Sequence, residues 1–359
     1  MRRPYIDWLR GVAVMMMFAA HATDAWTRDA DRASDVFYWR SVIAGFGAPL
    51  FLLLAGTAIA YSAASRVRRG ASDRAASRKV IARGWQIFGI AFLFRLQLYI
   101  TSLFYRWHSL LKVDILNVMG PSIAAAGWIW GCARTTAGKT LALAVPAIVL
   151  PLATPFIRGL NQLAALPDPI ESYIRPAGGF ANFTFFPSAA FVFAGAAIGV
   201  VLEHAADIRA ESRRIWLITA FGVALAAAAY ALSFQPSPFS NSHFWTTSPS
   251  FFYLRAGILM AGFGVAWLWS ETLWRGRWQP LVLFGQTSLF VYWVHIELVY
   301  GYLTKPLSHR LPLWASSLGV ILLSVVMYYL AKNAKGWVER KRSEDILDWR
   351  VRALTVMGL

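Results

Sequence analysis

The sequence predicts an all-α protein, a polytopic transmembrane helix bundle of about ten spans with both chain ends on the cytoplasmic side, N-in/C-in. Of its 359 residues, 57% are hydrophobic and only 15% are charged, whereas a soluble chain of this length would be nearer a quarter charged. Several apolar runs also reach the roughly 20 residues that a helix needs to cross a bilayer. Composition and run length therefore place the chain in a membrane.

The predicted spans follow the apolar runs along the chain. The fifth contains Pro146, Pro151 and Pro155, so it is the span expected to be broken. Two long, turn-rich loops, at 158–182 and 235–250, are expected either to cap a substrate entrance or to serve as connectors. The spans are expected at residues 9–27, 41–63, 80–105, 114–134, 140–157, 183–203, 214–234, 250–271, 280–303 and 312–333.

The positive charge sets the predicted direction of these spans. With the N-terminus inside, the Lys- and Arg-rich segments 66–79, 134–139, 209–214 and 335–352 all fall on one side. This matches the positive-inside rule, which places such residues in cytoplasmic loops. The sequence thus predicts one transmembrane domain over residues 1–335 and a basic cytoplasmic tail over 336–359. We expect a multi-pass protein of a bacterial plasma (inner) membrane.

Several function classes are disfavoured by what the sequence contains. The net charge of +17 is assigned to cytoplasmic loops, because no nucleic-acid-binding module accompanies it. A single cysteine, Cys132, rules out a disulfide within the chain and supports no cysteine metal site. Zinc-protease, serine-hydrolase and P-loop motifs are missing from the sequence. The predictions therefore include no metal and no nucleic acid.

Polar side chains recur at a similar depth in four predicted spans, toward their outer ends. Such residues are costly in a membrane and are functional candidates by default. Each also has a structural explanation: His295 could pack between helices, Arg95 could extend to the interface, and Asp114 could cap a helix. Together they predict a polar chamber opening to the outer face. The residues are His21, Asp24, Arg95, Asp114, Asn117 and His295.

This set of residue types suits acyl transfer by general-base catalysis. A neutral histidine can take the proton of the acceptor, a carboxylate can orient that histidine, and Asn or Arg can stabilise the tetrahedral oxyanion. Either His21 or His295 could be the base. The alternative is a proton-coupled transporter of a small or lipid-linked solute, in which the same residues form a proton relay.

Four segments occur in an order that resembles the transmembrane acyltransferase superfamily. They are YIDWLRGVAVMMMFAAH, FGAPLFLLLAG, LLKVDILNVMG and FGQTSLFVYWVHIELVYG. The chain is most similar to the group named after heparan-alpha-glucosaminide N-acetyltransferase, including its bacterial members. Arg10 and His21 also match the pattern of an arginine, ten residues and a histidine in the related acyltransferase-3 proteins.

The resemblance implies an acetyltransferase that moves an acyl group from cytosolic acetyl-CoA, or another acyl-CoA, to a sugar or glycan acceptor beyond the membrane. The catalytic candidates come from the polar set described above, and they are His21, Asp24, Asp114, Asn117 and His295. The basic residues expected near the phosphates of CoA are Arg10, Arg78, Lys79, Arg83 and Arg95. The expected partners are the lipid bilayer, acyl-CoA and the acceptor, and a homodimer is compatible with them.

The sequence also departs from the heparan-modifying group. The catalytic histidine of that group lies in the loop after the first conserved helix, and residues 22–40 contain no histidine. His21 stands where that group has an amide residue. Heparan itself is therefore not predicted as the substrate, and the acceptor stays open.

Overall fold

The structure is a computed structural model that describes residues 3–101, 107–239, 242–275, 279–344 and 348–357. Its elements are helical, apart from two isolated backbone bridges. The end of the span expected at 80–105 and parts of the expected tail at 336–359 lie outside the described residues. Within this frame the chain forms two compact units, residues 1–51 with 265–359 and residues 52–264. We refer to them as unit 1 and unit 2.

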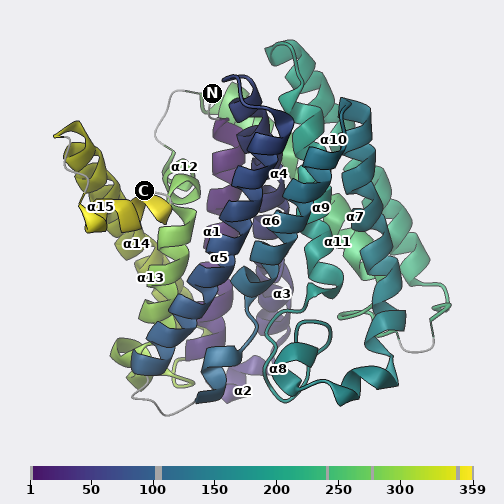
Figure 1. Cartoon of the computed structure of the whole chain (residues 1–359). Helices are drawn as coiled ribbons and strands as arrows, with labels where there is room; N and C mark the ends of the chain where they lie inside the picture. Colours follow the sequence, from purple (N-terminus) through teal and green to yellow (C-terminus); the bar gives the residue numbers. More distant parts are fainter. Residues whose placement is uncertain (1–2, 102–106, 240–241, 276–278, 345–347, 358–359) are drawn as a thin grey trace. The chain divides into compact units, whose positions relative to one another are not determined.

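Unit 1 is built from the two ends of the chain. Its first part contains α1 (Pro4–Trp26), α2 (Asp29–Arg32), α3 (Asp35–Ala44) and the start of α4 (Gly47–Val67). Its second part contains the π-helical turn Leu268–Leu273, α12 (Pro280–Gln286), α13 (Ser288–Tyr300), the 3-10 turn Tyr302–Leu307, α14 (Leu313–Ser343) and α15 (Trp349–Val356). Figure 1 shows these elements in chain order by colour.

Unit 2 holds the middle of the chain. Its long helices are α5 (Asp73–Thr101), α6 (Ile115–Cys132), α7 (Thr136–Arg158), α9 (Phe185–Glu203), α10 (Ile208–Ser233) and most of α11 (Pro249–Trp267). Three short elements lie between them: the 3-10 turns Trp107–Leu111 and Asn161–Ala165, and α8 (Asp168–Glu171). The fifth predicted span, which its three prolines could have broken, is the unbroken helix α7.

Close helix packing in both units depends on glycine. In unit 1 a Cβ on Gly285 of α12 would lie 1.8 Å from the carbonyl oxygen of Asp7 on α1. In unit 2 a Cβ on Gly120 of α6 would lie 2.8 Å from the carbonyl oxygen of Gly84 on α5. Membrane helices use small residues in this way, because backbones that approach closely gain dispersion contacts. The closely packed pairs α1–α12 and α5–α6 include the helices that carry most of the polar candidate residues.

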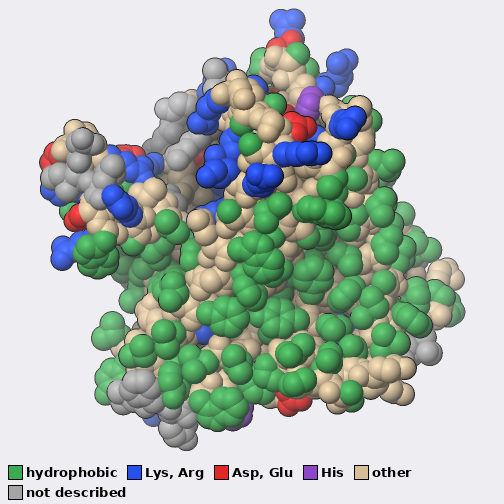
Figure 2. Space-filling model, viewed as in Figure 1, with side chains coloured by type: hydrophobic (Ala, Val, Ile, Leu, Met, Phe, Trp, Pro, Cys, Tyr) green, Lys and Arg blue, Asp and Glu red, His purple; other side chains and the backbone are tan. Residues whose placement is uncertain are grey.

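The structure supports a multi-pass membrane protein with seven or eight candidate spans among the described residues. Seven helical segments are long and apolar enough, and α12 with α13 adds an eighth if this pair, bent by 94°, counts as one span. Their outward faces are apolar, as on α7, where Leu141 and Phe156 are exposed. Figure 2 shows hydrophobic side chains over much of the visible surface. The seven are 35–67, 115–132, 136–158, 185–203, 208–233, 249–273 and 313–343.

The ten predicted spans all coincide with helices, but two of them are not candidate spans by composition. α1 and α5 are long enough, at 23 and 29 residues. Charged side chains lie along both helices, including Asp7, Arg10 and Asp24 in α1 and Arg95 in α5. These charged helices hold most of the residues that the sequence singled out.

Candidate active site

Two histidines from distant parts of the chain meet in unit 1. His21 lies five residues before the end of α1, and His295 lies in the middle of α13. Nδ1 of His21 is 2.9 Å from Nε2 of His295, and the two ring planes are nearly parallel, 5° apart. Sequence analysis had left these residues as alternatives for one role. The structure brings them together as a hydrogen-bonded pair.

The two histidines differ in exposure. His295 is fully buried, and its Nδ1 lies 2.9 Å from the carbonyl oxygen of Val291, one helical turn back. The rings of Phe18 and Tyr292 pack against it, with centroids 5.0 and 5.7 Å away. His21 is only partly buried. Of the pair, His21 is therefore the member that a substrate can approach.

The aromatic wall beside the pair continues to the end of α13. Tyr300, the last residue of that helix, is about half exposed and its ring lies 5.8 Å from the His21 ring. Phe284 of α12 packs edge-on against Phe18 at 5.7 Å. The buried His295 is thus flanked by Phe18 of α1 and Tyr292 of α13, and the half-exposed Tyr300 lies beside His21.

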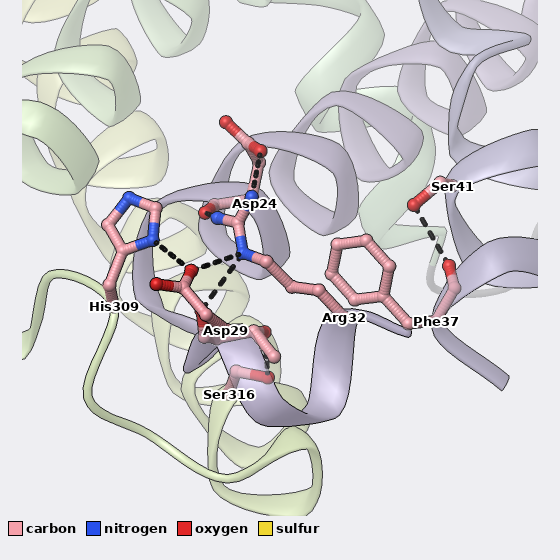
Figure 3. A network of polar contacts seen from close by, with 8 residues as sticks. Asp24, Asp29, Arg32, Phe37, Ser41, His309 and Ser316 are labelled. Atoms are coloured by element: carbon pink, nitrogen blue, oxygen red, sulfur yellow. Dashed lines mark hydrogen bonds and ion pairs between the residues drawn. The ribbon is translucent and has the colours of Figure 1, made fainter. Parts of the chain in front are cut away.

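Asp24 lies three residues after His21 on α1, and its side chain is joined to Arg32 of α2. Its carboxylate is 3.4 Å from Arg32, which also donates to the Asp24 backbone carbonyl, and 64% of its side chain is exposed. Arg32 in turn approaches Asp29, which contacts Nδ1 of His309 at 3.2 Å (Figure 3). This network joins the end of α1 to α2 and to the segment before α14. Asp24 therefore belongs to a structural network at the helix end.

Backbone contacts strengthen the same end of unit 1. Arg28 donates its backbone N–H to the carbonyl of Leu311 at 2.8 Å, and Leu311 donates to Trp26 at 2.8 Å. The Asp31 carboxylate accepts from the backbone N–H of Leu313 at 2.8 Å and pairs with Arg28 at 3.1 Å. The hydrogen bond from Arg28 lowers the pKa of Asp31, and the Leu313 hydrogen bond adds to this shift. The helix bearing His21 is thus held in place at its end.

Arg10 lies on the same face of α1 as His21. His21 is the eleventh residue after Arg10, close to three full turns, so the two side chains share a face about 16 Å apart along the axis. Arg10 approaches the buried Asp7 at 3.7 Å, and Gln286 donates to the other oxygen of Asp7 at 3.4 Å. Lys335 of α14 donates to Gln286 at 2.5 Å. Sequence analysis missed Gln286, although it lies inside one of the quoted segments.

The remaining catalytic candidates form a second polar cluster, in unit 2. Asp114 caps the N-terminus of α6: its side chain accepts from the backbone of Ile115 at 2.8 Å, and Asn117 completes a capping box. Asp114 also pairs with the buried Arg95 of α5 at 2.7 Å. The Asn117 amide donates to the Tyr173 hydroxyl at 3.4 Å. Burial raises the pKa of Tyr173, and that hydrogen bond partly opposes the rise.

The other basic candidates sit near the start of α5. Arg78 and Lys79 are exposed there, and Arg83 is partly buried one turn further on. Asp73 is the single acidic residue in the sequence of α5, so this end of the helix carries an excess of basic residues. Within the described residues, no group of three or more His, Cys, Asp or Glu side chains is arranged to hold a metal ion.

Comparison with known protein families gives a match that spans nearly the whole chain. Residues 3–331 match the family model of the acyltransferase 3 family, described as an acyltransferase domain. A comparison with curated proteins found no match. The family match begins at the start of α1 and runs into α14, so it includes both histidines and both polar clusters.

Proposed function

The chain belongs to the acyltransferase 3 family, and we propose that it moves an acetyl group from acetyl-CoA to a sugar or glycan acceptor, with His21 as the general base. The integral membrane acyltransferase follows from the family. The acetyl group, the CoA donor, the glycan acceptor and the base are our proposal. The similarity of four segments to the heparan-alpha-glucosaminide N-acetyltransferase group supports the acetyl donor and a glycan acceptor, without implying heparan.

The observation that carries the proposal is the shared face of α1 with Arg10 and His21. CoA has its phosphates at one end and its thioester at the other end of a long flexible arm. An arginine and a base on one face, about 16 Å apart, suit the two ends of such a molecule. Arginine matches phosphate geometry well, because its guanidinium donates two parallel hydrogen bonds.

The choice of His21 as base follows from access. His295 is fully buried, and its two ring nitrogens face the Val291 carbonyl and His21. No substrate atom can reach a nitrogen that is already occupied in the protein interior. His21 is partly exposed and has the half-exposed Tyr300 beside it. An acceptor bound against this face would meet His21 first.

The reaction proposed for this base is a direct transfer. His21 takes the proton of the acceptor hydroxyl or amino group as its oxygen or nitrogen attacks the thioester carbonyl carbon. The tetrahedral intermediate then breaks its C–S bond, and the leaving CoA sulfur receives the proton back from the imidazolium. The products are the acetylated acceptor and free CoA, so atoms and charge balance. Arg95 and Asn117 stay candidates for stabilising the oxyanion, and Asp114 stays a predicted catalytic residue.

The proposed topology follows the charge pattern. With ten spans, α1 and α5 included, both chain ends lie in the cytoplasm of a bacterial plasma membrane. The donor then enters from the side of Arg10, Arg78, Lys79 and Arg83, and the acceptor lies on the opposite side. The single-domain boundary at residue 335 and any homodimer also remain proposals. Cysteine-scanning with a membrane-impermeant maleimide at residues 28 and 340 tests this topology directly.

The first test of the function is donor binding by the purified protein in detergent. Titration calorimetry should show acetyl-CoA binding, with CoA as the comparison ligand. Membranes from cells expressing the protein, given acetyl-CoA labelled in the acetyl group, should then transfer label to a glycan fraction. If the protein neither binds acetyl-CoA nor transfers the label, the proposal is contradicted. Proton flux in liposomes without CoA, dependent on an added solute, would support a transporter instead.

A further inference from the structure

The structure assigns His295 a positioning role in acyl transfer: from α13 it fixes the tautomer of His21, so that Nε2 of His21 is the nitrogen that accepts the substrate's proton. This inference rests on the proposed function. It adds a second histidine that never touches the substrate. The role usually given to a carboxylate beside a catalytic histidine falls here to a neutral imidazole.

The first step is that His295 is itself fixed. Its Nδ1 lies 2.9 Å from the carbonyl oxygen of Val291. A carbonyl oxygen can only accept a hydrogen bond, so Nδ1 of His295 carries the hydrogen. Phe18 and Tyr292 pack against the ring, and none of its surface is exposed. A flip of the ring would break the Val291 hydrogen bond inside the protein, which is costly.

The second step passes this constraint to His21. A neutral imidazole with its hydrogen on Nδ1 has its lone pair on Nε2. Nε2 of His295 lies 2.9 Å from Nδ1 of His21, so it accepts and Nδ1 of His21 donates. Neutral His21 then has its own lone pair on Nε2, the nitrogen on the far side of the ring from His295. The hydrogen bond to the Val291 carbonyl thus fixes the tautomer of His295, and His295 in turn fixes which nitrogen of His21 can act as the base.

The third step concerns the charge that forms during reaction. When Nε2 of His21 takes the acceptor's proton, its Nδ1–H becomes a charge-assisted donor to His295, and that bond shortens and strengthens. His295 therefore favours the imidazolium at the moment it forms. A neutral partner stabilises the imidazolium less than a carboxylate would. This suits a base that must be empty before the acceptor arrives.

The groups around the pair allow this assignment. Tyr292 contacts His295, and Tyr300 contacts His21. The charged residues on the packed elements include Asp24, which is bonded to Arg32 of α2, and Arg40 of α3, which donates to Thr23 and Ser317. Glu297 lies two residues after His295 on α13, and one of its carboxylate oxygens is buried without a hydrogen-bond partner among the described residues. A purely structural explanation is that the pair is one interhelical hydrogen bond holding α1 to α13. The two explanations predict different results for conservative variants.

The activity test compares two replacements of His295. In His295→Gln, the amide oxygen can still accept from Nδ1 of His21, so we expect kcat to fall by no more than about tenfold. In His295→Phe the ring shape stays and the acceptor is lost, so we expect kcat to fall about a hundredfold, the lower range for general-base catalysis. The KM for acetyl-CoA should change little in either. Equal losses in both variants, or full activity in His295→Phe, would overturn the assignment.

A third variant gives a readout that a structural role would not move. In His295→Glu, a carboxylate beside Nδ1 favours protonated His21, so the acid limb of the kcat profile should shift to higher pH. The matched control is His204→Gln in unit 2. His204 also has Nδ1 near the carbonyl four residues back, Val200, at 3.1 Å, but lies outside the histidine pair. Its replacement should leave kcat and the pH profile unchanged, and an unshifted profile in His295→Glu would contradict the assignment.

A spectroscopic measurement separates this inference from the function on which it rests. Histidine labelled with ¹⁵N reports its tautomer by the shifts of the two ring nitrogens, and single variants assign the six histidines. We expect both His21 and His295 to carry hydrogen on Nδ1, with a coupling across the N–H···N bond. Hydrogen on Nε2 of His21 would overturn the assignment even in an active enzyme. An inactive wild type with the expected tautomers would instead count against the acetyl-CoA reaction.

Discussion

The two polar pairs that join helices in this protein look alike and are built for different work. In unit 1, His21 and His295 form a hydrogen-bonded pair in which His295 is buried and His21 is only partly buried. In unit 2, Arg95 and Asp114 form a buried ion pair. The other carboxylate oxygen of Asp114 accepts a hydrogen bond from the backbone at the N-terminus of α6. Because both oxygens of Asp114 already have partners within the fold, neither is available to take a proton from a substrate. The comparison thus contrasts the proposed reactive pair, His21 and His295, with a scaffolding pair, Arg95 and Asp114.

The largest expected effect tests the reactive pair. His21→Ala removes the proposed base, and we expect acetyl transfer to fall by about a thousandfold, within the range measured for general-base catalysis. The melting temperature in detergent should fall modestly, because the buried Nε2 of His295 loses its hydrogen-bond partner, at a cost of about 1–3 kcal/mol. Labelled acetyl transfer and a thermal melt, both beside His204→Ala, measure the two effects. Normal transfer by His21→Ala would remove the base from the mechanism.

The next effect tests the scaffolding pair. Asp114→Ala leaves the Arg95 guanidinium buried without its partner, since the side chains of Arg95 and Asp114 are only 7% and 15% exposed. Breaking such a pair costs about 3–5 kcal/mol of unfolding free energy, and loss of the cap adds about 1 kcal/mol. Denaturation in detergent should therefore show a large loss of stability.

The double variant Arg95→Met with Asp114→Asn sharpens this prediction. It removes the stranded charge while Asn keeps a capping oxygen, so much of the lost stability should return. A stability close to that of the wild type in Asp114→Ala would contradict the scaffolding role. A folded Asp114→Ala protein without acyl transfer would instead support the catalytic role that the sequence predicted for Asp114.

A smaller effect tests the donor end of α1. Arg10→Ala removes the proposed phosphate contact, and we expect the KM for acetyl-CoA to rise about tenfold with kcat nearly unchanged, as for a charge-assisted hydrogen bond lost equally in ground and transition states. Acetyl-pantetheine, which has no phosphate, should react equally well with wild type and variant. A rise in KM for both donors would show that Arg10 acts through the fold, by way of Asp7.

The sequence predicted the helices better than their polar partners. Apolar run length located all ten helical segments, because that signal is local to each segment. It could not show that α7 passes three prolines or that α12 and α13 bend at Thr287, since neighbouring helices decide whether a freed backbone group is satisfied. Spacing on one helix suggested Asp24 as partner of His21. The actual partner, His295, is 274 residues away, and only the fold brings it there.

The smallest effect concerns the exposed charges that fasten the end of α1. The Arg28 hydrogen bond and the Leu313 backbone N–H lower the pKa of Asp31, so its carboxylate stabilises the folded state above the unfolded pKa of about 4. This contribution is lost as the pH falls through the lower folded value. Wild type should therefore melt slightly above Asp31→Asn at pH 6, and the gap should close below about pH 4. A gap that does not change with pH would mean that shape, and not charge, fastens this end. Exposed ion pairs contribute little to stability. The loss of stability in Asp31→Asn should therefore be far smaller than that in Asp114→Ala, because the ion pair of unit 2 is buried.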